Sequence, residues 1–299
     1  MYTIFYEDEW RCEVLQKGVQ CDMKMENSKI IFFDIDGTLI SMGGEVSPKL
    51  QEGLATLQAN GHKICIATGR SLDSKVENLK KLNWNGYVLA NGAYGEYDNE
   101  LIVCETIDKR RVKEFVEYTN ELPEVGIIFE GNDGAFTTKD DAEIALKIML
   151  EITKGKLSRE AFFSYFKLVE DLSEIKNVNK MMYFNGEQYA KGLIERFGDD
   201  LDFLPNSITQ SSGWDTAEIM KKGVTKATGI EKIIKRAGYE RADVIAFGDG
   251  YNDIAMIQYA GIGVAMGNGV DQLKQTADFV TDTQVNDGVF KMLQELKLI

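Results

Sequence analysis

The sequence predicts an α/β protein built on a doubly wound parallel sheet, with an α+β module inserted into it. Short apolar runs alternate with segments of helical periodicity at both ends of the 299-residue chain. This alternation is typical of a parallel sheet with helices on both faces. Between these ends the strand and helix patterns follow a different order. The length exceeds that of an ordinary domain and leaves room for such an insertion.

The N-terminal part of the expected sheet consists of three strands and two helices. Apolar runs predict buried strands at 30–33, 63–67 and 87–90. Ser47 and Pro48 supply an N-cap and a first helical residue, and Asn60 with Gly61 ends that helix. A second helix is expected from residue 71 to residue 82.

The same alternation returns near the C-terminus, and a different pattern fills the middle of the chain. Near the C-terminus we expect helices at 225–238 and 253–260 and strands at 244–247, 262–265 and 279–280. In the middle we expect strands at 125–129, 135–138, 163–168 and 180–184 and helices at 112–121, 141–153 and 187–197. The expected domains are a core at 29–91 and 209–299 and an inserted cap at 92–208, after a flexible, non-catalytic extension at 1–28.

The charge balance and the apolar pattern exclude several classes of partner. The chain has 34 basic and 48 acidic residues, and its net charge of −14 repels nucleic acid and anionic membranes. No apolar run approaches the roughly 18 residues of a membrane span, and the N-terminus lacks the pattern of a signal peptide. We therefore expect a soluble, cytoplasmic protein that binds neither nucleic acid nor a membrane. Its oligomeric state stays open.

The histidine and cysteine content restricts the chemistry further. The one histidine, His62, lies in a turn-like segment and excludes sites that need two imidazoles from this chain. The four cysteines form no CxxC pair and no zinc-ligand spacing, which fits a reducing compartment. Catalysis is therefore left to carboxylates, hydroxyls and lysines.

The segment Asp34-Ile35-Asp36-Gly37-Thr38 directly follows the first buried strand. Ligands of parallel sheets gather beyond the carboxyl ends of the strands, where this segment lies. Two carboxylates two residues apart repel each other unless a cation or a shared proton offsets the charge, and glycine permits a sharp turn beside them. A turn rich in aspartate is the alternative, but the clean apolar strand favours a functional site.

Three further segments follow expected strands or begin expected helices. Residues 68–70 (Thr-Gly-Arg) offer a hydroxyl and a backbone N–H to a phosphate oxygen, or form a simple capped turn. Residues 248–253 (Gly-Asp-Gly-Tyr-Asn-Asp) carry oxygen ligands that suit Mg²⁺, or only cap the next helix. Lys226, favoured over Lys222, begins a helix, where a cation is unfavourable unless it faces an anion.

The order DxDGT, TGR, KGVTKA and GDGYND resembles the four motifs of the haloacid dehalogenase superfamily. The segment between the second and third motifs is similar in position to the C2-type α/β cap of Cof-type phosphatases. The resemblance covers residues 29–299 and is strongest at the motifs. The sequence departs from the pattern at Ala227, where the family often has glycine, and in the extension at 1–28.

The resemblance implies a Mg²⁺-dependent phosphatase that acts on a small phosphorylated metabolite, such as a sugar phosphate or a phosphorylated cofactor. Asp34 would be the nucleophile that forms an aspartyl-phosphate, and Asp36 would be the general acid and base. Lys226 would neutralise a phosphoryl oxygen. The implied phosphate-binding residues are Thr68, Gly69, Arg70 and Asn252, and the implied metal ligands are Asp34, Asp36 (through its backbone carbonyl), Asp249 and Asp253.

Two alternatives use the same fold. A phosphomutase would form the same aspartyl-phosphate but return the phosphoryl group to its substrate. A catalytically silent binding protein would be favoured if a motif residue were missing, and none is. The phosphatase is therefore the hypothesis that the sequence favours.

Overall fold

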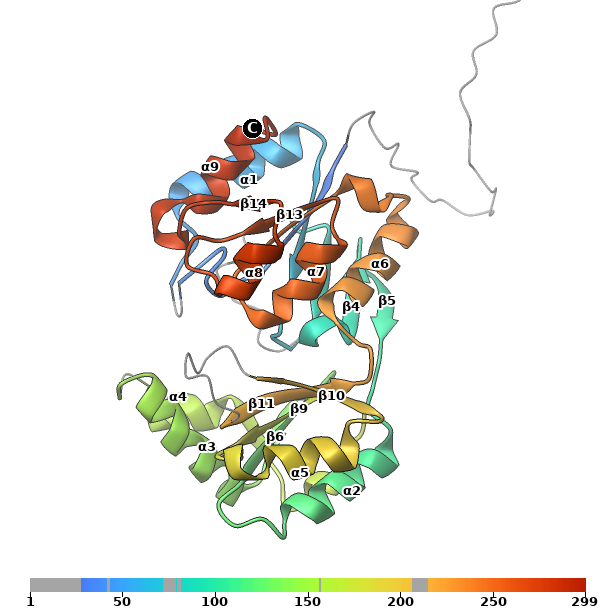
Figure 1. Cartoon of the computed structure of the whole chain (residues 1–299), viewed down its shortest axis with the longest axis vertical. Helices are drawn as coiled ribbons and strands as arrows, with labels where there is room; N and C mark the ends of the chain where they lie inside the picture. The colour runs from blue at the N-terminus through green and yellow to red at the C-terminus, as the bar shows by residue number, and fades with distance from the viewer. Residues whose placement is uncertain (1–27, 42–43, 72–78, 80–81, 156, 206–214) are drawn as a thin grey trace, which may run out of the picture.

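The computed structural model describes residues 28–41, 44–71, 79, 82–155, 157–205 and 215–299. These residues form two β-sheets, one above the other in Figure 1, each with helices packed against it. The predicted extension at 1–28, apart from Ser28, and most of the helix predicted at 71–82 lie outside the described residues. Within the described ranges no helix combines the length and apolar character needed to cross a membrane.

The first sheet has eight strands among the described residues, in the spatial order β14-β13-β12-β1-β2-β3-β4-β5. Along the chain they are β1 (Ile30–Phe33), β2 (Lys63–Ala67), β3 (Gly86–Leu89), β4 (Tyr94–Tyr97), β5 (Glu100–Cys104), β12 (Val244–Gly248), β13 (Ile262–Ala265) and β14 (Phe279–Val280). The strands from β14 to β3 run parallel, and β4 and β5 extend the sheet in antiparallel pairs. The residues of β1 are fully buried, because the strand is central and covered on both faces.

Helices cover both faces of the first sheet, which confirms the predicted doubly wound α/β core. On one face pack α1 (Pro48–Ala59) and α9 (Gly288–Glu295). On the other face pack α6 (Lys226–Ala237), α7 (Ile254–Tyr259) and α8 (Asp271–Thr276). Successive residues of β1 alternate between these two apolar clusters. The predicted N-cap is observed, since the Ser47 side chain accepts a hydrogen bond from the backbone N–H of Leu50.

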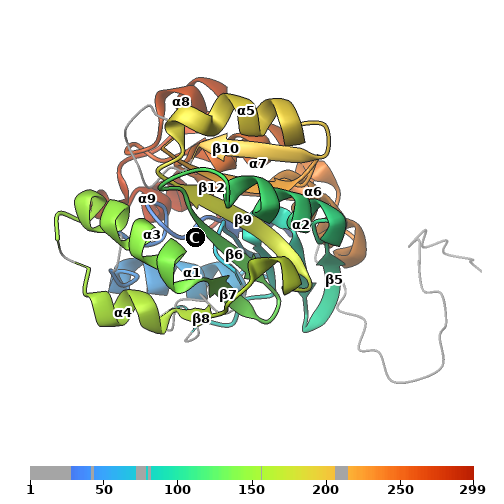
Figure 2. The ribbon, with the colours of Figure 1, turned by 90° about the horizontal axis from the view of Figure 1, so that it is seen from below.

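The second sheet has the spatial order β10-β11-β9-β6-β7-β8. Its strands are β6 (Gly126–Gly131), β7 (Gly134–Thr137), β8 (Phe166–Leu168), β9 (Val178–Phe184), β10 (Leu201–Pro205) and β11 (Thr216–Lys221), and its helices are α2 (Lys109–Thr119), α3 (Lys139–Ile152), α4 (Arg159–Ser164) and α5 (Glu187–Phe197). Met181 and Tyr183 of β9 pack with α2 and α5, whereas Met182 and Phe184 pack with α3 and α4. Figure 2 views the molecule from the side on which α2 and α5 lie.

The domain boundaries predicted at 92 and 208 are wrong for the two sheets. β4 and β5, placed in the cap by sequence, belong to the first sheet because the short helical turn Ala90–Gly92 returns the chain alongside β3. β11, placed in the core by sequence, belongs to the second sheet because it pairs with β9 along nearly its whole length. The second sheet and its helices therefore span 109–221.

Several short elements also differ from the prediction. The strand predicted at 163–168 is instead the end of α4 followed by β8, because the Ser158 side chain caps that helix by accepting from the N–H of Ala161. β10, α8 and α9 were not predicted. Neither α8 nor α9 has a side-chain hydrogen bond at its N-cap, so the sequence lacks the usual signal for a helix start.

Glu105 forms an ion-pair bridge between the two sheets. Its carboxylate accepts hydrogen bonds from Lys221, the last residue of β11, at 2.7 Å and from Lys232 of α6 at 2.8 Å. These two bonds lower the pKa of Glu105 to about 2. The bridge therefore stabilises the folded protein mainly while Glu105 is ionised.

We expect Glu105→Gln to lower the free energy of unfolding at pH 7 by about 0.5 kcal/mol, a value discounted for the solvent screening of this partly exposed group. The folded-state pKa lies below the unfolded value of about 4.3, so the contribution is present above pH ~4.3 and is lost as the pH falls toward 2. Urea unfolding at pH 7 and pH 3 measures the difference, with the exposed Glu170→Gln as the control. If Glu105→Gln lowered the free energy of unfolding equally at both pH values, the stabilising role of the ion pair would be contradicted.

Candidate active site

The central parallel strands of the first sheet end at one edge, and three of the predicted motifs follow them there. β1 lies between β2 and β12 in a parallel arrangement. Asp34, Thr68 and Asp249 come directly after these three strands. The edge faces the second sheet, since the Nζ of Lys180 in β9 donates to the carbonyl of Gly69 at 2.7 Å. The predicted convergence of the motifs at one edge is thus observed.

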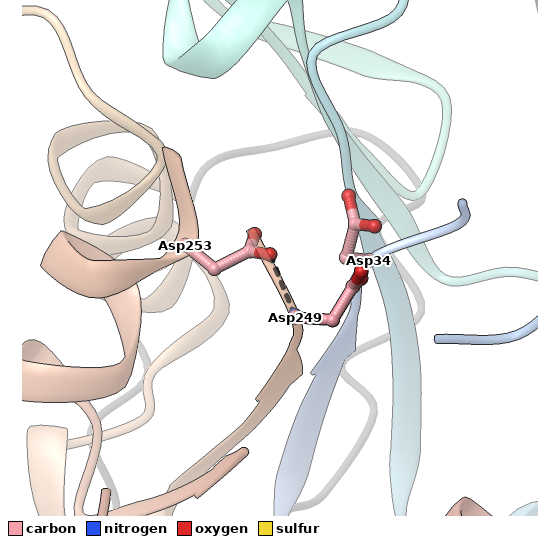
Figure 3. Close-up of side chains that lie close together, drawn as sticks. All are labelled: Asp34, Asp249 and Asp253. Atoms are coloured by element: carbon pink, nitrogen blue, oxygen red, sulfur yellow. Dashed lines mark hydrogen bonds between the residues drawn. The ribbon is translucent and has the colours of Figure 1, made fainter. Parts of the chain in front are cut away.

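Asp34, Asp249 and Asp253 form a cluster of carboxylates at this edge (Figure 3). One oxygen of each lies within 4.8 Å of the others. Asp253 is fully buried, and its Oδ2 accepts hydrogen bonds from the backbone N–H groups of Asp249 at 2.9 Å and Gly250 at 2.8 Å. These bonds fix Asp253 relative to the turn that carries Asp249.

Lys226 brings a positive charge into this cluster. Its side chain is fully buried, and its Nζ donates to Asp34 Oδ1 at 2.6 Å and to Asp253 Oδ1 at 2.5 Å. The N-cap of α6 is Thr225, so Lys226 is the first helical residue. A cation is unfavourable at a helix start, and the two carboxylates explain why it lies there. Lys222, the weaker candidate, is exposed.

Burial and charge repulsion shift the pKa values of the cluster. Burial raises the pKa of Asp34 well above its usual range; Lys226 opposes this shift, and the neighbouring carboxylates add to it. Burial together with Asp253 raises the pKa of Asp249 to about 7. Burial alone would lower the pKa of Lys226, but Asp253 and Asp34 raise it above its usual range. One lysine therefore compensates only part of the negative charge.

The donor set fits a hard divalent cation. Carboxylate oxygens are the ligands that Mg²⁺ takes in proteins, and it needs only one or two of them because it keeps several waters. A cation near Asp34 and Asp249 would also offset the burial and the carboxylate repulsion that together raise their pKa values. The carboxylate of Asp36 is bound by Arg70, which leaves its backbone carbonyl as the predicted ligand from that residue.

Asp36 and Arg70 join the first motif to the second. Arg70 Nε donates to Asp36 Oδ2 at 2.7 Å, and its terminal nitrogen donates to Oδ1 at 2.6 Å, a bidentate arrangement that fixes the carboxyl group. Gly37 follows with a φ of +86°, and a Cβ there would lie 2.2 Å from Asp249 Oδ2. Glycine is therefore required both for the turn and for the approach of Asp249. The Thr38 hydroxyl donates to Asp249 Oδ1 at 3.1 Å.

The remaining predicted phosphate-binding residues, Thr68, Gly69 and Asn252, lie around the same edge. Thr68 is buried, and its Oγ1 accepts a hydrogen bond from the N–H of Arg70 at 3.3 Å. A Cβ on Gly69 would lie 3.0 Å from Asn91 Oδ1 and 3.2 Å from Asn252 Nδ2. Asn252 Nδ2 in turn donates to Asn91 Oδ1 at 3.0 Å. The segments after β2, β3 and β12 therefore meet here.

Two residues that reach this edge from the second sheet were missed in the sequence. Lys180 of β9 contacts Gly69, and Glu218 of β11 accepts a hydrogen bond from the Asn91 side chain at 2.7 Å. The signal that indicates Lys180 is a lysine inside a strand whose residues are all buried. A lysine that is buried in such a strand cannot reach solvent, so its charge needs an acidic or hydrogen-bonding partner inside the protein.

Comparisons with known proteins decide the family. Residues 31–293 match the family model described as haloacid dehalogenase-like hydrolase, which covers most of the chain. The chain belongs to this family. One curated relative and two structural neighbours align with the chain over nearly their whole length.

Three similar proteins are phosphatases. The 5-amino-6-(5-phospho-D-ribitylamino)uracil phosphatase YitU of Bacillus subtilis is 28% identical over 276 residues, which cover 89% of this chain and 96% of YitU. The HAD subclass IIB sugar phosphatase BT4131 has a TM-score of 0.76 and 30% identity, over 91% of this chain and 100% of that one. The phosphatase BT1666 from Bacteroides thetaiotaomicron has a TM-score of 0.75 and 27% identity, over 95% of this chain and 100% of that one.

This haloacid dehalogenase-like hydrolase is accordingly a phosphatase of the Cof type, and the resemblance inferred from the four motifs is confirmed. Of the three similar proteins, YitU is named for a phosphorylated ribitylamino compound and BT4131 is named a sugar phosphatase. The family and the enzyme class are thus established independently of the roles of individual residues.

We expect Lys226→Met to lower the free energy of unfolding by about 3 kcal/mol in EDTA, because it leaves two buried carboxylates without their cation. Urea unfolding measures this loss. The control is Lys232→Met on the same helix, whose partly exposed ion pair with Glu105 is worth about 0.5 kcal/mol. Equal losses in the two variants would contradict the assigned role of Lys226.

Proposed function

We propose that the protein is a Mg²⁺-dependent phosphatase that hydrolyses small phosphomonoesters through an aspartyl-phosphate on Asp34. The observation that carries this proposal is the contact of Asp34 with the buried Lys226 inside a carboxylate cluster. A nucleophilic carboxylate, a fixed cation and hard oxygen donors meet at the carboxyl edge of the sheet. Phosphoryl transfer depends on this combination of positioning and charge.

Asp34 carries out the covalent step, and Asp36 carries out the proton transfers. A carboxylate oxygen of Asp34 attacks phosphorus, so a bond from Asp34 to phosphorus forms as the bond to the leaving oxygen breaks. Asp36 donates a proton to that leaving oxygen. It then accepts a proton from the water that attacks the aspartyl-phosphate, which releases phosphate and restores Asp34. Arg70 donates to both carboxyl oxygens of Asp36 in this structure, so one of these two bonds would have to open for Asp36 to carry the proton and reach the leaving oxygen.

The other residues of the site bind the phosphoryl group. Lys226 neutralises charge as it spreads over the phosphoryl oxygens, and the Thr68 hydroxyl and the Gly69 N–H bind another oxygen. Asn252, fixed by its hydrogen bond to Asn91, lies beside them.

The carboxylates of the site would hold the metal ion. Asp34, Asp249 and the backbone carbonyl of Asp36 would hold Mg²⁺, and Asp253 would support this arrangement from its buried position. The ion supplies the positive charge that lets a carboxylate approach a dianionic phosphate.

A small phosphorylated metabolite is the substrate class that we propose. YitU and BT4131 are named for a phosphorylated ribitylamino compound and for sugar phosphates, and the net charge of −14 disfavours nucleic acids, membranes and polyanionic substrates. We assign residues 109–221 to a cap that contacts the leaving group and sets substrate choice. We place the activity in the cytoplasm, in keeping with the cysteine usage.

The activity is tested by phosphate release from a panel of small phosphomonoesters with Mg²⁺ and with EDTA. We expect Mg²⁺-dependent release by the wild type and a loss of at least about a thousandfold in Asp34→Asn, because an amide oxygen is a poor nucleophile. Asp271→Asn, an exposed carboxylate of α8, is the control and keeps full activity.

The other outcomes separate the alternatives. Transfer of phosphate between positions of a hexose bisphosphate, without release, would identify a phosphomutase. Binding of a phosphorylated metabolite without turnover would identify a silent binding protein. Full activity in Asp34→Asn would refute the nucleophile assignment.

We expect Mg²⁺ at about a hundred times its Kd to stabilise the wild type by about 2.7 kcal/mol. Asp249→Asn should lose most of this effect, because it removes one carboxylate donor from the cluster. Thermal unfolding with and without Mg²⁺ measures both values, with Asp271→Asn again as the control. An unchanged Mg²⁺ effect in Asp249→Asn would show that Asp249 is not a ligand.

A further inference from the structure

Three charged side chains lie together on one face of the second sheet: the buried Glu130 of β6 and Lys180 of β9, and the partly buried Glu218 of β11. Lys180 is opposite Glu130 in the register, and its Nζ lies 3.2 Å from Glu130 Oε2 and 3.0 Å from Glu218 Oε1. Lys180 is only 3% exposed and Glu130 only 6%. Burial alone would lower the pKa of Lys180, but the two glutamates raise it above its usual range, so the lysine stays charged.

The third contact of Lys180 crosses to the first sheet. Its Nζ donates to the backbone carbonyl of Gly69 at 2.7 Å. Two glutamates alone would satisfy the charge of this lysine, so the contact with Gly69 is an additional feature of its position. It falls within the loop that we assign to phosphate binding.

The peptide groups of this loop are anchored by their carbonyl oxygens. The backbone N–H of Asn91 donates to the Thr68 carbonyl at 3.1 Å, and Lys180 donates to the Gly69 carbonyl. In a planar trans peptide the N–H points away from the C=O. Fixing the Thr68 carbonyl therefore directs the Gly69 N–H, and fixing the Gly69 carbonyl directs the Arg70 N–H.

Asn91 connects the same charged residues to Asn252. Its Nδ2 donates to Glu218 Oε2 at 2.7 Å, and its Oδ1 accepts from Asn252 Nδ2 at 3.0 Å. Asn91 is buried and has φ +53° and ψ +30°, a left-handed conformation that is unusual for a residue other than glycine. Such a conformation persists where the surrounding structure determines it. Gly69, Lys180, Glu218, Asn91 and Asn252 thus form one hydrogen-bonded chain across both sheets.

We propose that Lys180, Glu218 and Asn91 are positioning residues that hold the Gly69 loop and Asn252 in the geometry that binds the phosphate group. None of the three needs to touch the phosphate, because they act through the carbonyl of Gly69 and the side chain of Asn252. The affinity of the first sheet for phosphate therefore depends on side chains supplied by the second sheet. This inference rests on the proposed function, which places phosphate at that loop.

The test is the Kd for inorganic phosphate, measured by calorimetry in the presence of Mg²⁺. We expect Lys180→Met and Asn91→Gly each to weaken binding by about tenfold, the effect of losing hydrogen bonds to charged groups. Glycine adopts the left-handed conformation readily, so Asn91→Gly removes the side chain and leaves the backbone in place. We expect the double variant to lose less than the product of the two single losses, because both interrupt one chain.

A matched control separates positioning from general loss of structure. Asn185 is also left-handed, at φ +60°, and its Nδ2 donates to the carbonyl of Glu124 in an exposed part of the second-sheet unit. Asn185→Gly should bind phosphate as the wild type does. Unchanged phosphate affinity in Lys180→Met and Asn91→Gly would overturn the inference, whatever their melting temperatures. A wild type that hydrolyses no phosphomonoester and binds no phosphate would overturn the proposed function and this inference with it.

Discussion

The structure depends on one buried contact, between Lys226 and the carboxylates of Asp34 and Asp253. Lys226 lies 192 residues from Asp34 and 27 from Asp253, so the contact forms only when β1, β12 and α6 have come together. Each partner would be costly to bury without the others. The same burial keeps the three charges close and dry, which makes them effective for chemistry. On the proposed function, the three atoms that stabilise this part of the fold would also take part in the reaction.

The region between the two sheets repeats this arrangement. Lys180 lies between Glu130 and Glu218 as Lys226 lies between Asp34 and Asp253, so each lysine has two carboxylate partners. In both places an uncompensated negative charge remains close to a backbone turn. At Lys226 this charge favours a metal ion. Lys180 also donates a hydrogen bond to the Gly69 carbonyl, and this bond connects the second sheet to the edge of the first.

Much of the first sheet could be predicted from the sequence because its strands are buried on both faces and appear as continuous apolar runs. β1 and β2 are examples. In the second-sheet unit, α5 was predicted to the residue. β4 and β5 were missed because β4 contains Gly95 and β5 is partly exposed, so neither has a continuous apolar pattern. The predicted boundary at residue 92 was wrong for the same reason.

The aspartates and Lys226 could be predicted because each lies beside a strand end or a helix start, which are features of local sequence. Lys180 could not be assigned, because its partners lie 50 and 38 residues away on other strands, and sequence alone does not determine strand order. Asn91 was missed as a partner of Asn252 because that contact requires a left-handed residue that no local pattern predicts.

The ion pair between Glu105 and Lys221 has a mechanical consequence. The chain passes between the two sheets twice, after β5 and after β11. Glu105 lies at the first crossing and Lys221 at the second, and the Nζ of Lys221 lies 2.7 Å from Oε2 of Glu105. This ion pair therefore holds the two connecting segments of the chain next to each other. The contacts of Lys180 with Gly69 and of Glu218 with Asn91 join the two sheets at further points, so a rotation about the two connections would have to break these contacts first.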